Sequence, residues 1–369
     1  MKNIVYIINQ LRNSGPVRVL LDICQNLDRS KYQPYIITLM NEDPQRSIAQ
    51  KFKDINVKII EFHFSFIQLE LNTANIASII TKRISPLGSY IIHAHCYHPI
   101  LIASKINTPT TCTIHSISKD DYVISKGYII GNYMSYRLRH NLHNITHPIA
   151  ISEYMYSYYK NVCNNKLSVI YNGVSCNIYE NLPSKEDLYK KLAIDSKKKI
   201  IIVTGHLSKL KNPTFIIKEL KKSQRQDFMC IFIGDGNEKE KCIQYIDGDP
   251  RFRLEGYVFN VKEYLKIADF FISASFTEGL PLAVIEALNM GIASLISAIP
   301  PHKEIAQKID HTMVNTFSFE ENELLNKFEA YLDKSYSRHE IANKSINLFS
   351  SKNMTLKYEN VYDKLFNEQ

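Results

Sequence analysis

Short apolar runs alternate with helix-length segments along almost the whole chain, and this alternation constrains the fold more than any other feature. Ten runs have the length and composition of strands: Asn3–Ile8, Tyr35–Leu39, Val57–Phe62, Tyr90–His93, Thr110–Ile114, Ile200–Thr204, Phe228–Ile233, Arg253–Leu254, Phe270–Ser273 and Ile292–Ile296. Helical patterns lie between them, at Val17–Leu27, Thr73–Ile84, Pro213–Lys222, Lys239–Tyr245, Val261–Ala268 and Leu282–Met290. Continuous apolar strands that alternate with helices are typical of parallel sheets covered on both faces. We therefore expect an α/β protein made of doubly wound, Rossmann-like domains.

The length of 369 residues favours two domains of ordinary size. After Asn172 the chain turns polar and lysine-rich until the apolar run that begins at Ile200. We therefore expect an N-terminal domain at residues 1–172 and a C-terminal domain at residues 173–349.

The end of the chain, from Ser345 to Phe366, has the spacing of an amphipathic helix. Its apolar positions are Leu348, Met354, Tyr358, Tyr362 and Leu365. We expect residues 350–369 to form a helix that packs back on the N-terminal domain.

Seven cysteines are scattered along the chain, and no two form a C-x-x-C pair: Cys24, Cys96, Cys112, Cys163, Cys176, Cys230 and Cys242. This pattern argues against a disulfide framework or a zinc site and favours a reducing compartment. The start, MKNIVYIINQLRNSG, has too short an apolar run for a signal peptide, and no apolar run approaches the roughly 18 residues of a membrane span. We therefore expect a cytoplasmic protein.

The net positive charge is concentrated in the first half of the chain. Residues 1–172 hold 18 Lys and Arg against 10 Asp and Glu, whereas residues 173–369 hold 27 of each kind. A basic half suggests an anionic partner, such as nucleic acid, an acidic membrane surface or a phosphorylated substrate. A solvated basic surface without a partner fits the same count.

The stretch FTEGLPLAVIEALNMG, residues 276–291, has the signals of a strand end followed by a buried helix. We expect the strand to end near Ser275, Pro281 to take the first helical position and Gly291 to follow the end of the helix. The buried face of this helix is expected at Leu282, Ile285 and Leu288.

Two glutamates accompany this helix, Glu278 in the turn before it and Glu286 in its second turn. A helix N-terminus attracts anions, Gly279 allows a ligand to approach the backbone, and carboxylates accept hydrogen bonds from hydroxyls. A nucleotide diphosphate sugar presents sugar hydroxyls, a diphosphate and ribose hydroxyls in the matching order. In the alternative interpretation, Glu278 is only an anion at a helix start and Glu286 is a solvated helix residue.

EGLPLAVIEALNMG resembles the E-x7-E signature of retaining glycosyltransferases of family 4, which have the GT-B fold of two Rossmann-like domains facing a central cleft. In the N-terminal half, NSGPVRVLLDICQNL resembles the family's glycine loop and helix, IIHAHCYHP and TTCTIHS two histidine-bearing strand ends, and IAISEYM and VIYNGV the blocks before the linker. In the C-terminal half, VTGHLSKLKNP resembles the phosphate loop, IFIGDGNEKEK the next strand and turn, and LEGYVFNVKEYLKIADFFISAS the nucleotide-facing segment.

This resemblance implies a set of site residues. The catalytic residues would be His115, Glu278 and Lys211, and the donor-binding residues would be Gly15, Gly205, His206, Lys211, Tyr257, Val258, Glu278, Gly279, Leu280 and Glu286. Glu278 would contact the donor sugar hydroxyls, with the Gly279 and Leu280 amides nearby. Glu286 would bind the ribose and Lys211 the diphosphate.

The resemblance also assigns roles outside the E-x7-E stretch. Gly15 would let the N-terminal loop approach the diphosphate, His115 would lie beside the donor sugar at the reaction centre, and the Tyr257–Val258 backbone would hold the base. One departure is His206, which stands where the family usually has a charged, forked Arg. Two others are Ser14-Gly15-Pro16 in place of Gly-Gly and PPHKEIAQKIDHTMV in place of a glycine-rich turn.

The reaction implied is transfer of a sugar to an acceptor hydroxyl with retention of anomeric configuration. Lys211 and backbone amides would stabilise the charge on the departing diphosphate. No metal and no cofactor are expected, because a lysine with helix amides can replace a cation at the departing diphosphate. Closure of the two domains would exclude water.

Other constellations favour other functions less. His93, His95, Cys96 and His98 suggest a metal site or a thiol nucleophile, but no carboxylate cluster or oxyanion-hole motif accompanies them. IGDGNEKE lacks the G-x-x-x-x-G-K-[ST] pattern of an ATPase. The basic, tyrosine-rich segment from Lys126 to Asn144 fits either a membrane-surface helix or a helix packed on the N-terminal domain, and no nucleic-acid motif supports a third interpretation.

The sequence thus predicts a UDP- or GDP-sugar-dependent transferase that acts on a glycan or lipid-linked acceptor in O-antigen, lipopolysaccharide or capsule synthesis. Its basic half leaves open a peripheral contact with an anionic membrane, and nucleic acid is not an expected partner. Two alternatives remain, a sugar-nucleotide 2-epimerase of the same fold and a non-catalytic GT-B binding subunit.

Overall fold

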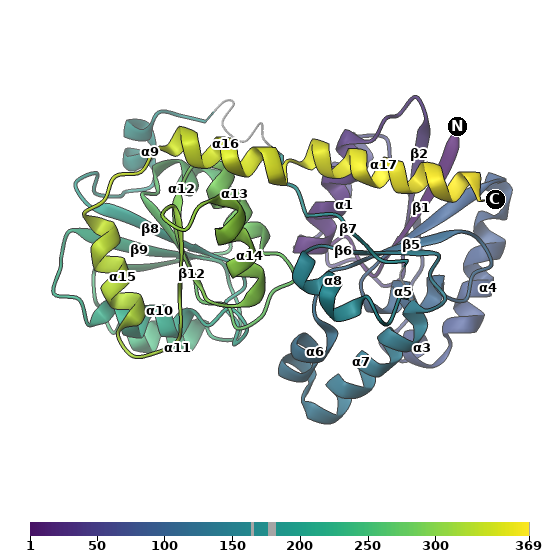
Figure 1. Ribbon diagram of the computed structural model, residues 1–369, viewed down its shortest axis with the longest axis horizontal. Coiled ribbons are helices and arrows are strands. Elements are labelled where there is room, and N and C mark those ends of the chain that lie inside the picture. Colours follow the sequence, from purple (N-terminus) through teal and green to yellow (C-terminus); the bar gives the residue numbers. More distant parts are fainter. Residues whose placement is uncertain (164–165, 176–181, 369) are drawn as a thin grey trace. The chain divides into compact units, whose positions relative to one another are not determined.

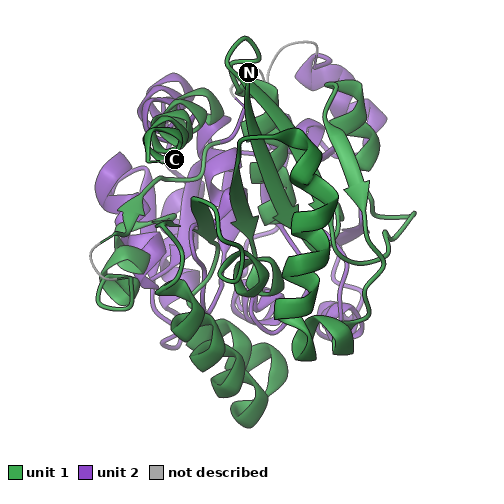
Figure 2. Cartoon of the chain, turned by 90° about the vertical axis from the view of Figure 1, so that its right-hand side faces the viewer, with its two compact units in different colours: residues 1–173, 351–369 green, residues 174–350 purple. Residues whose placement is uncertain are grey.

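The computed structural model describes residues 1–163, 166–175 and 182–368, so Cys176 and part of the predicted linker lie outside the described residues. The chain divides into two compact units, residues 1–173 with 351–369 and residues 174–350. Figure 2 shows these two units in separate colours. Each boundary lies one residue beyond the predicted position.

The first unit is built on a parallel sheet of order β3-β2-β1-β4-β5-β6-β7. Its strands are β1 (Lys2–Ile8), β2 (Tyr32–Thr38), β3 (Lys58–Glu61), β4 (Tyr90–His95), β5 (Thr110–Ile114), β6 (His147–Ala150) and β7 (Ser168–Val169). Its helices are α1 (Gly15–Asn26), α2 (Ala49–Asp54), α3 (Phe66–Leu71), α4 (Thr73–Ile84), a 3-10 turn at Ser85–Leu87, α5 (Tyr97–Ala103), α6 (Ser118–Lys126), α7 (Tyr128–Leu142), α8 (Glu153–Tyr159) and α17 (Ser351–Asn367). Figure 1 labels these elements along the chain.

The second unit has a parallel sheet of order β10-β9-β8-β11-β12-β13. Its strands are β8 (Lys199–Thr204), β9 (Phe228–Ile233), β10 (Phe252–Gly256), β11 (Phe270–Ser273), β12 (Ala293–Ser297) and β13 (Val314–Phe317). Its helices are α9 (Lys185–Lys191), α10 (Pro213–Lys221), α11 (Lys239–Ile246), α12 (Val261–Ile267), α13 (Leu282–Asn289), α14 (Pro300–Ile309), α15 (Glu323–Leu332) and α16 (Arg338–Phe349).

Both sheets confirm the predicted doubly wound, Rossmann-like architecture. In β1 the five residues from Ile4 to Ile8 are buried without alternation, which shows that helices cover both faces of the sheet. In each unit the strand order grows outward in both directions from the first strand of the unit, β1 or β8. This arrangement creates one switch point in each sheet, between β1 and β4 and between β8 and β11.

Some edge strands were missed by the sequence prediction. β6, β7 and β13 have two to four residues each, and β6 contains Pro148, which weakens any strand signal. Their neighbours in the sheet align them by backbone pairing, as when Val314 pairs with Ser294. Across the described residues, each helix falls short of the length and hydropathy that crossing a bilayer requires.

The helix predicted at residues 350–369 corresponds to α17, but the wider amphipathic pattern that begins at Ser345 covers parts of two helices. Ser350, with ψ of 140°, ends α16 before α17 begins, so the pattern read from Ser345 to Phe366 spans a break. Leu348 belongs to α16 and is exposed, whereas Met354, Tyr358, Tyr362 and Leu365 are buried in α17. Helix α17 packs on α1 and β4 of the first unit, and α16 packs on α13 of the second.

Candidate functional site

The carboxyl ends of β8 and β11 meet at the switch point of the second sheet. These two strands are neighbours and pair through Ile201 with Phe270 and Ile202 with Phe271. In doubly wound sheets, ligands bind outside the carboxyl ends of the strands at such a point. The loops that follow β8 and β11 are therefore the expected ligand-binding loops, and both contain predicted site residues.

The loop after β8 contains Gly205 and Lys211. Gly205 has φ of +139°, and a Cβ built on it would lie 3.8 Å from Lys211 Cε, so the lysine stem packs against the glycine. A Cβ on Gly234, in the turn after β9, would lie 1.9 Å from the Gly205 carbonyl oxygen. Only glycines allow these two turns to approach so closely, and the packing holds the Lys211 stem along the loop.

The ammonium of Lys211 reaches the loop after β11 and forms an ion pair with Glu278. The Glu278 carboxylate also accepts a 2.7 Å hydrogen bond from Ser275 Oγ. Burial would raise the pKa of the Glu278 carboxyl, but the charge of Lys211, the His302 ring and these hydrogen bonds bring it below its usual value. Glu278 is therefore ionised at neutral pH and ready to accept hydrogen bonds.

Backbone and serine contacts hold these loops in place. The Phe276 amide donates to the Leu210 carbonyl at 2.8 Å, which joins the loop after β11 to the loop after β8. Ser297 Oγ, at the end of β12, donates to the Ser275 carbonyl at 2.6 Å. The carboxylate and the ammonium are thus positioned by three neighbouring strands, and not by the local sequence around either residue.

Helix α13 carries Glu286 in its second turn, as predicted, but Glu286 is only 8% exposed. The interpretation of Glu286 as a solvated helix residue is therefore wrong. Pro281 is the N-cap, with ψ of 105°, and the helix begins one residue later than expected. Leu282 is partly exposed, whereas Ile285 and Leu288 are buried as predicted.

The end of α13 explains the need for Gly291. The Gly291 amide donates to the Leu288 carbonyl, and the Ile292 amide donates to the Ala287 carbonyl, which together form a Schellman motif. Gly291 has φ of +70°, and a Cβ there would lie 2.3 Å from the Arg338 carbonyl oxygen. Both the turn and the packing against Arg338, the first residue of α16, therefore require glycine.

The remaining donor-site residues of the second unit lie on loops at the same edge of the sheet. Gly279 and Leu280 are buried just before α13, and Gly279 keeps φ outside the positive range. His206 is exposed, and its Cε1 atom would lie 2.9 Å from a Cβ placed on Gly236. Tyr257 and Val258 follow the edge strand β10.

His302 is a residue of this network that the sequence analysis did not identify. It is the third residue of α14 and fully buried, and its Nδ1 lies 2.9 Å from the Ser297 carbonyl oxygen. Burial lowers the pKa of His302 to about 4, although the Glu278 charge opposes this shift. His302 lies in the segment PPHKEIAQ, which the sequence analysis considered only for its lack of a glycine-rich turn.

In the first unit, Gly15 and His115 lie at the carboxyl ends of strands. Gly15 is the first residue of α1, and Ser14, its N-cap, makes no side-chain capping bond. His115 follows β5, and its Nε2 lies 3.0 Å from His95 Nδ1. Burial lowers the pKa of His115 to about 3, so the imidazole is neutral at physiological pH.

The histidines of β4 are packed into hydrogen-bond networks. His93 contacts the Tyr362 hydroxyl through Nδ1 and the Thr113 hydroxyl through Nε2, both at 2.8 Å. Burial raises the pKa of the Cys96 thiol to about 12, which disfavours the thiolate that a nucleophile needs. No cluster of three or more potential metal ligands is found among the described residues.

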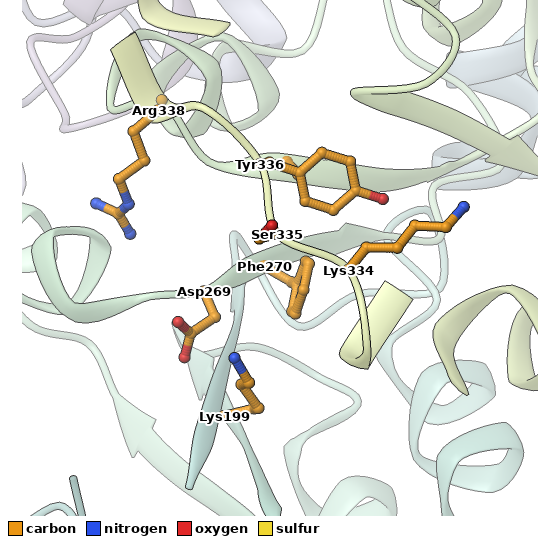
Figure 3. A pocket seen from close by; sticks show the side chains of 9 residues that line it. Lys199, Asp269, Phe270, Lys334, Ser335, Tyr336 and Arg338 are labelled. Atoms are coloured by element: carbon orange, nitrogen blue, oxygen red, sulfur yellow. The ribbon is translucent and has the colours of Figure 1, made fainter. Parts of the chain in front are cut away.

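A pocket of about 180 Å³ lies at the opposite edge of the second sheet, beside the first residues of β8, β11 and β12. It is lined in part by Lys199, Asp269, Lys334, Tyr336 and Arg338 (Figure 3). Because ligand sites of doubly wound sheets are at the carboxyl ends of the strands, we do not assign this pocket to the Lys211–Glu278 site.

Comparison with known proteins places the two halves of the chain in related families. A family model described as "Glycosyltransferase Family 4" matches residues 13–177, and one described as "Glycosyl transferases group 1" matches residues 184–348. Together the two models span most of the chain, and they meet at the boundary between the two structural units.

Individual proteins show the same similarity. The O-antigen biosynthesis glycosyltransferase WclY of Escherichia coli is 24% identical over 379 residues, covering 99% of each chain. The putative teichuronic acid biosynthesis glycosyltransferase TuaC of Bacillus subtilis is 24% identical over 249 residues, which are 65% of this chain and 61% of TuaC. The crystal structure of Anabaena Alr3699/HepE in complex with UDP-glucose has a TM-score of 0.78 at 14% identity and covers 99% of this chain and 100% of that one. The chain therefore belongs to the family 4 glycosyltransferases and has the GT-B fold.

Proposed function

We propose that the protein transfers a sugar from a nucleotide diphosphate sugar, UDP- or GDP-linked, to a hydroxyl of a glycan acceptor with retention of anomeric configuration. The observation that supports this function is the Lys211–Glu278 ion pair at the switch point, directly before the helix that holds the buried Glu286. On donor binding, Lys211 exchanges the carboxylate for the diphosphate, and Glu278 turns its acceptor oxygens to the sugar hydroxyls. Glu286 binds the ribose, and the Tyr257–Val258 backbone holds the base.

In the reaction, the bond between the anomeric carbon and the diphosphate oxygen breaks, and the electron pair leaves with the nucleotide diphosphate. Lys211 and the amides before α13 stabilise that charge. The acceptor oxygen attacks on the same face, and its proton passes to the departing phosphate oxygen. Gly15 allows the N-terminal loop near the diphosphate, and His115 contacts the donor sugar as a neutral group. The proposal requires neither a metal nor a cofactor.

The acceptor belongs, in this proposal, to the synthesis of a bacterial surface polysaccharide such as O-antigen, lipopolysaccharide or capsule. The similarity to WclY and TuaC supports this assignment. A lipid-linked acceptor also fits the charge of the first unit, since its first 172 residues hold 18 basic against 10 acidic side chains. The protein would meet such an acceptor at the cytoplasmic face of the membrane.

Three helices of the first unit present an apolar surface suited to that encounter, which we call the α3–α7 surface. Its exposed apolar residues are Phe66, Ile67 and Leu71 of α3, Ile124 of α6, and Tyr128, Ile129, Ile130, Tyr133 and Tyr136 of α7. Arg137 of α7 pairs with Glu70 of α3, which joins these helices, and Figure 1 shows α3, α6 and α7 beside one another. Exposed Lys119 and Lys126 flank the apolar residues. The combination of isoleucines, tyrosines and lysines fits an anionic lipid surface.

The donor side is tested by isothermal titration of the full-length protein with UDP, GDP, UDP-glucose, UDP-galactose and GDP-mannose, followed by NMR of the products formed with a polysaccharide repeat unit as acceptor. We expect binding of one nucleotide class and a product with the donor's anomeric configuration. Conversion of the donor without an acceptor would identify a 2-epimerase. Binding without turnover of any acceptor tested would favour a non-catalytic subunit.

The membrane side is tested by flotation with vesicles of phosphatidylglycerol or of phosphatidylcholine. We expect binding to the anionic vesicles, reduced at least tenfold in an Ile129→Ser/Ile130→Ser double variant, since each isoleucine would lose roughly 1.5–3 kcal/mol of burial. The matched control is Ile243→Ser/Leu356→Ser, which changes two exposed apolar residues elsewhere. Equal binding by the two double variants would contradict the assignment.

A further inference from the structure

His302 has one ring nitrogen that is satisfied and one that is not. Nδ1 lies 2.9 Å from the Ser297 carbonyl oxygen, which can only accept, so Nδ1 carries the proton. Nε2 is consequently a bare acceptor. It is buried and has no hydrogen-bond partner within the described part of the chain. A buried acceptor without a donor is costly, roughly 1–3 kcal/mol, and such groups commonly belong to functional sites.

The imidazole is connected to Glu278 through a series of three hydrogen bonds. His302 Nδ1 donates to the Ser297 carbonyl at 2.9 Å, Ser297 Oγ donates to the Ser275 carbonyl at 2.6 Å, and Ser275 Oγ donates to the Glu278 carboxylate at 2.7 Å. The three steps cross from the start of α14 to the end of β12 and on to the loop after β11. All of these groups except the carboxylate are on residues that are fully buried.

The ring also lies within electrostatic reach of both members of the ion pair. Burial, with a smaller effect of Lys211 in the same direction, outweighs the raising effects of Glu278 and of the hydrogen bond to Ser297 and lowers the pKa of His302 to about 4. His302 is therefore neutral at physiological pH and its Nε2 can only accept a hydrogen bond. The site thus contains two acceptors, the Glu278 carboxylate and the His302 Nε2 nitrogen, together with the ammonium of Lys211, which the proposed function assigns to the diphosphate.

We propose that His302 is a further donor-binding residue, whose Nε2 accepts a hydrogen bond from a hydroxyl of the donor sugar while its Nδ1 positions Glu278 through Ser297 and Ser275. The inference rests on the proposed function. In this proposal, Nε2 becomes accessible to the sugar once Lys211 has moved from Glu278 to the diphosphate. A sugar with hydroxyls facing both acceptors is then preferred over one that lacks the hydroxyl facing Nε2.

The test uses the difference between a nucleotide and its sugar conjugate. Because His302 contacts only the sugar in this proposal, its replacement should weaken the binding of UDP-glucose and leave the binding of UDP unchanged. In His302→Asn the amide nitrogen can still donate to the Ser297 carbonyl, but the acceptor at Nε2 is gone. If titration shows that the protein prefers guanine nucleotides, GDP and GDP-mannose replace this pair.

We expect His302→Asn to bind UDP-glucose roughly tenfold more weakly than the wild type, with UDP affinity within twofold. His302→Gln, which places an amide oxygen near Nε2, should recover part of that loss. Ser297→Ala, which removes the hydrogen bond to the Ser275 carbonyl, should also weaken the binding of UDP-glucose more than the binding of UDP. His311→Asn changes an exposed histidine of the same unit and serves as the control.

The outcomes separate the inference from the function on which it rests. Equal losses for UDP and UDP-glucose in folded His302→Asn would show a structural role only and overturn the inference. Unchanged affinity for both ligands would overturn it as well. If the wild type binds no nucleotide or nucleotide sugar, the proposed function fails and the inference fails with it. Thermal unfolding of each variant shows whether it is folded, and Ser297→Ala provides the test if neither His302 variant folds.

Discussion

Lys211 and Glu278, 67 positions apart in the chain, form an ion pair across the two loops at the switch point of the second sheet. The side chain of Glu278 is 13% exposed and that of Lys211 is 34% exposed. The carboxylate retains its second contact, the Ser275 hydroxyl, if the lysine moves. In the proposed function, Lys211 leaves this carboxylate for the diphosphate of the donor while Glu278 keeps the Ser275 contact.

Replacing Lys211 with Ala should weaken binding of the nucleotide diphosphate. The ammonium is expected to contribute roughly 1.5–3 kcal/mol to that binding, because it is a charged hydrogen-bond donor, so the Kd for UDP should rise about tenfold or more. Titration calorimetry measures this change. Lys209→Ala removes an exposed lysine from the same loop and should leave the Kd within twofold.

Replacing Glu278 with Gln should reduce transfer more than nucleotide binding. The change keeps the shape of the side chain but removes the charge that accepts the sugar hydroxyls and contacts Lys211. We expect kcat to fall about 100-fold, in the range of lost transition-state electrostatics, while the Kd for UDP changes little. Glu321→Gln, at an exposed position, is the control. A variant with full activity would show that the E-x7-E stretch is not the reaction site.

Glu286 should discriminate between ribose and its deoxygenated analogue. Wild-type protein is expected to bind UDP roughly tenfold more tightly than 2′,3′-dideoxy-UDP, because in the proposed function the ribose hydroxyls donate hydrogen bonds to the buried Glu286 carboxylate and the dideoxy analogue cannot. In Glu286→Gln this difference should shrink to about twofold. The two proteins and the two ligands give four titrations, which form a double-mutant cycle. If Glu286→Gln still prefers UDP about tenfold over the dideoxy analogue, the ribose binds at another residue.

Replacing Gly291 with Ala should destabilise the second unit. A Cβ at this position would lie 2.3 Å from the Arg338 carbonyl oxygen, in addition to the cost of φ at +70°. We expect a loss of at least about 2 kcal/mol in the free energy of unfolding, measured by urea denaturation. Gly248→Ala is matched in φ, at +72°, but meets nothing within 4 Å, so it should cost only about 1 kcal/mol. Equal costs would show that the first residue of α16, Arg338, moves aside.

Acidification should destabilise the fold through its buried histidines. Burial lowers the pKa of His115 to about 3 and that of His302 to about 4, whereas the unfolded chain holds both near 6.5. Between these pKa values the unfolded state therefore binds more protons than the folded state. The contribution of the neutral buried histidines to stability is present above about pH 6.5 and is lost as the pH falls towards 3. Urea unfolding at pH 7 and pH 5 should show the decrease, and His302→Asn should show a smaller one.

The sequence predicted most of the sheet and missed parts that only neighbouring strands align. β1 and β9 were recognised because each consists mainly of consecutive apolar residues. β6 and β13 have only four residues each and take their strand conformation from pairing with β5 and β12. Pro281 illustrates the limit at element ends, since proline fits both the cap and the first helical position, and the turn before α13 decides between them.

The candidate site shows the same division. The spacing of Glu278 and Glu286 on either side of a helix start was visible in the sequence, and so were the glycines of the loop after β8. The burial of Glu286 was not visible in the sequence, because α13 has apolar residues on several sides. Its solvated face therefore cannot be assigned without the elements that pack against it. His302 was overlooked because its partners, Ser297 and Ser275, come from other strand ends.

The sequence by itself determined the class of fold and the chemical content of the site, since the period of the apolar residues and the order of acid, glycine, proline and helix are local properties of the chain. Tertiary structure decided which groups meet. Lys211 and Glu278 come from the loops after β8 and β11, and His302 comes from α14, which follows β12. Parallel pairing brings these three strand ends to one edge of the sheet. Their ionisation states depend on burial and on one another's charge, and neither is defined until the sheet has formed.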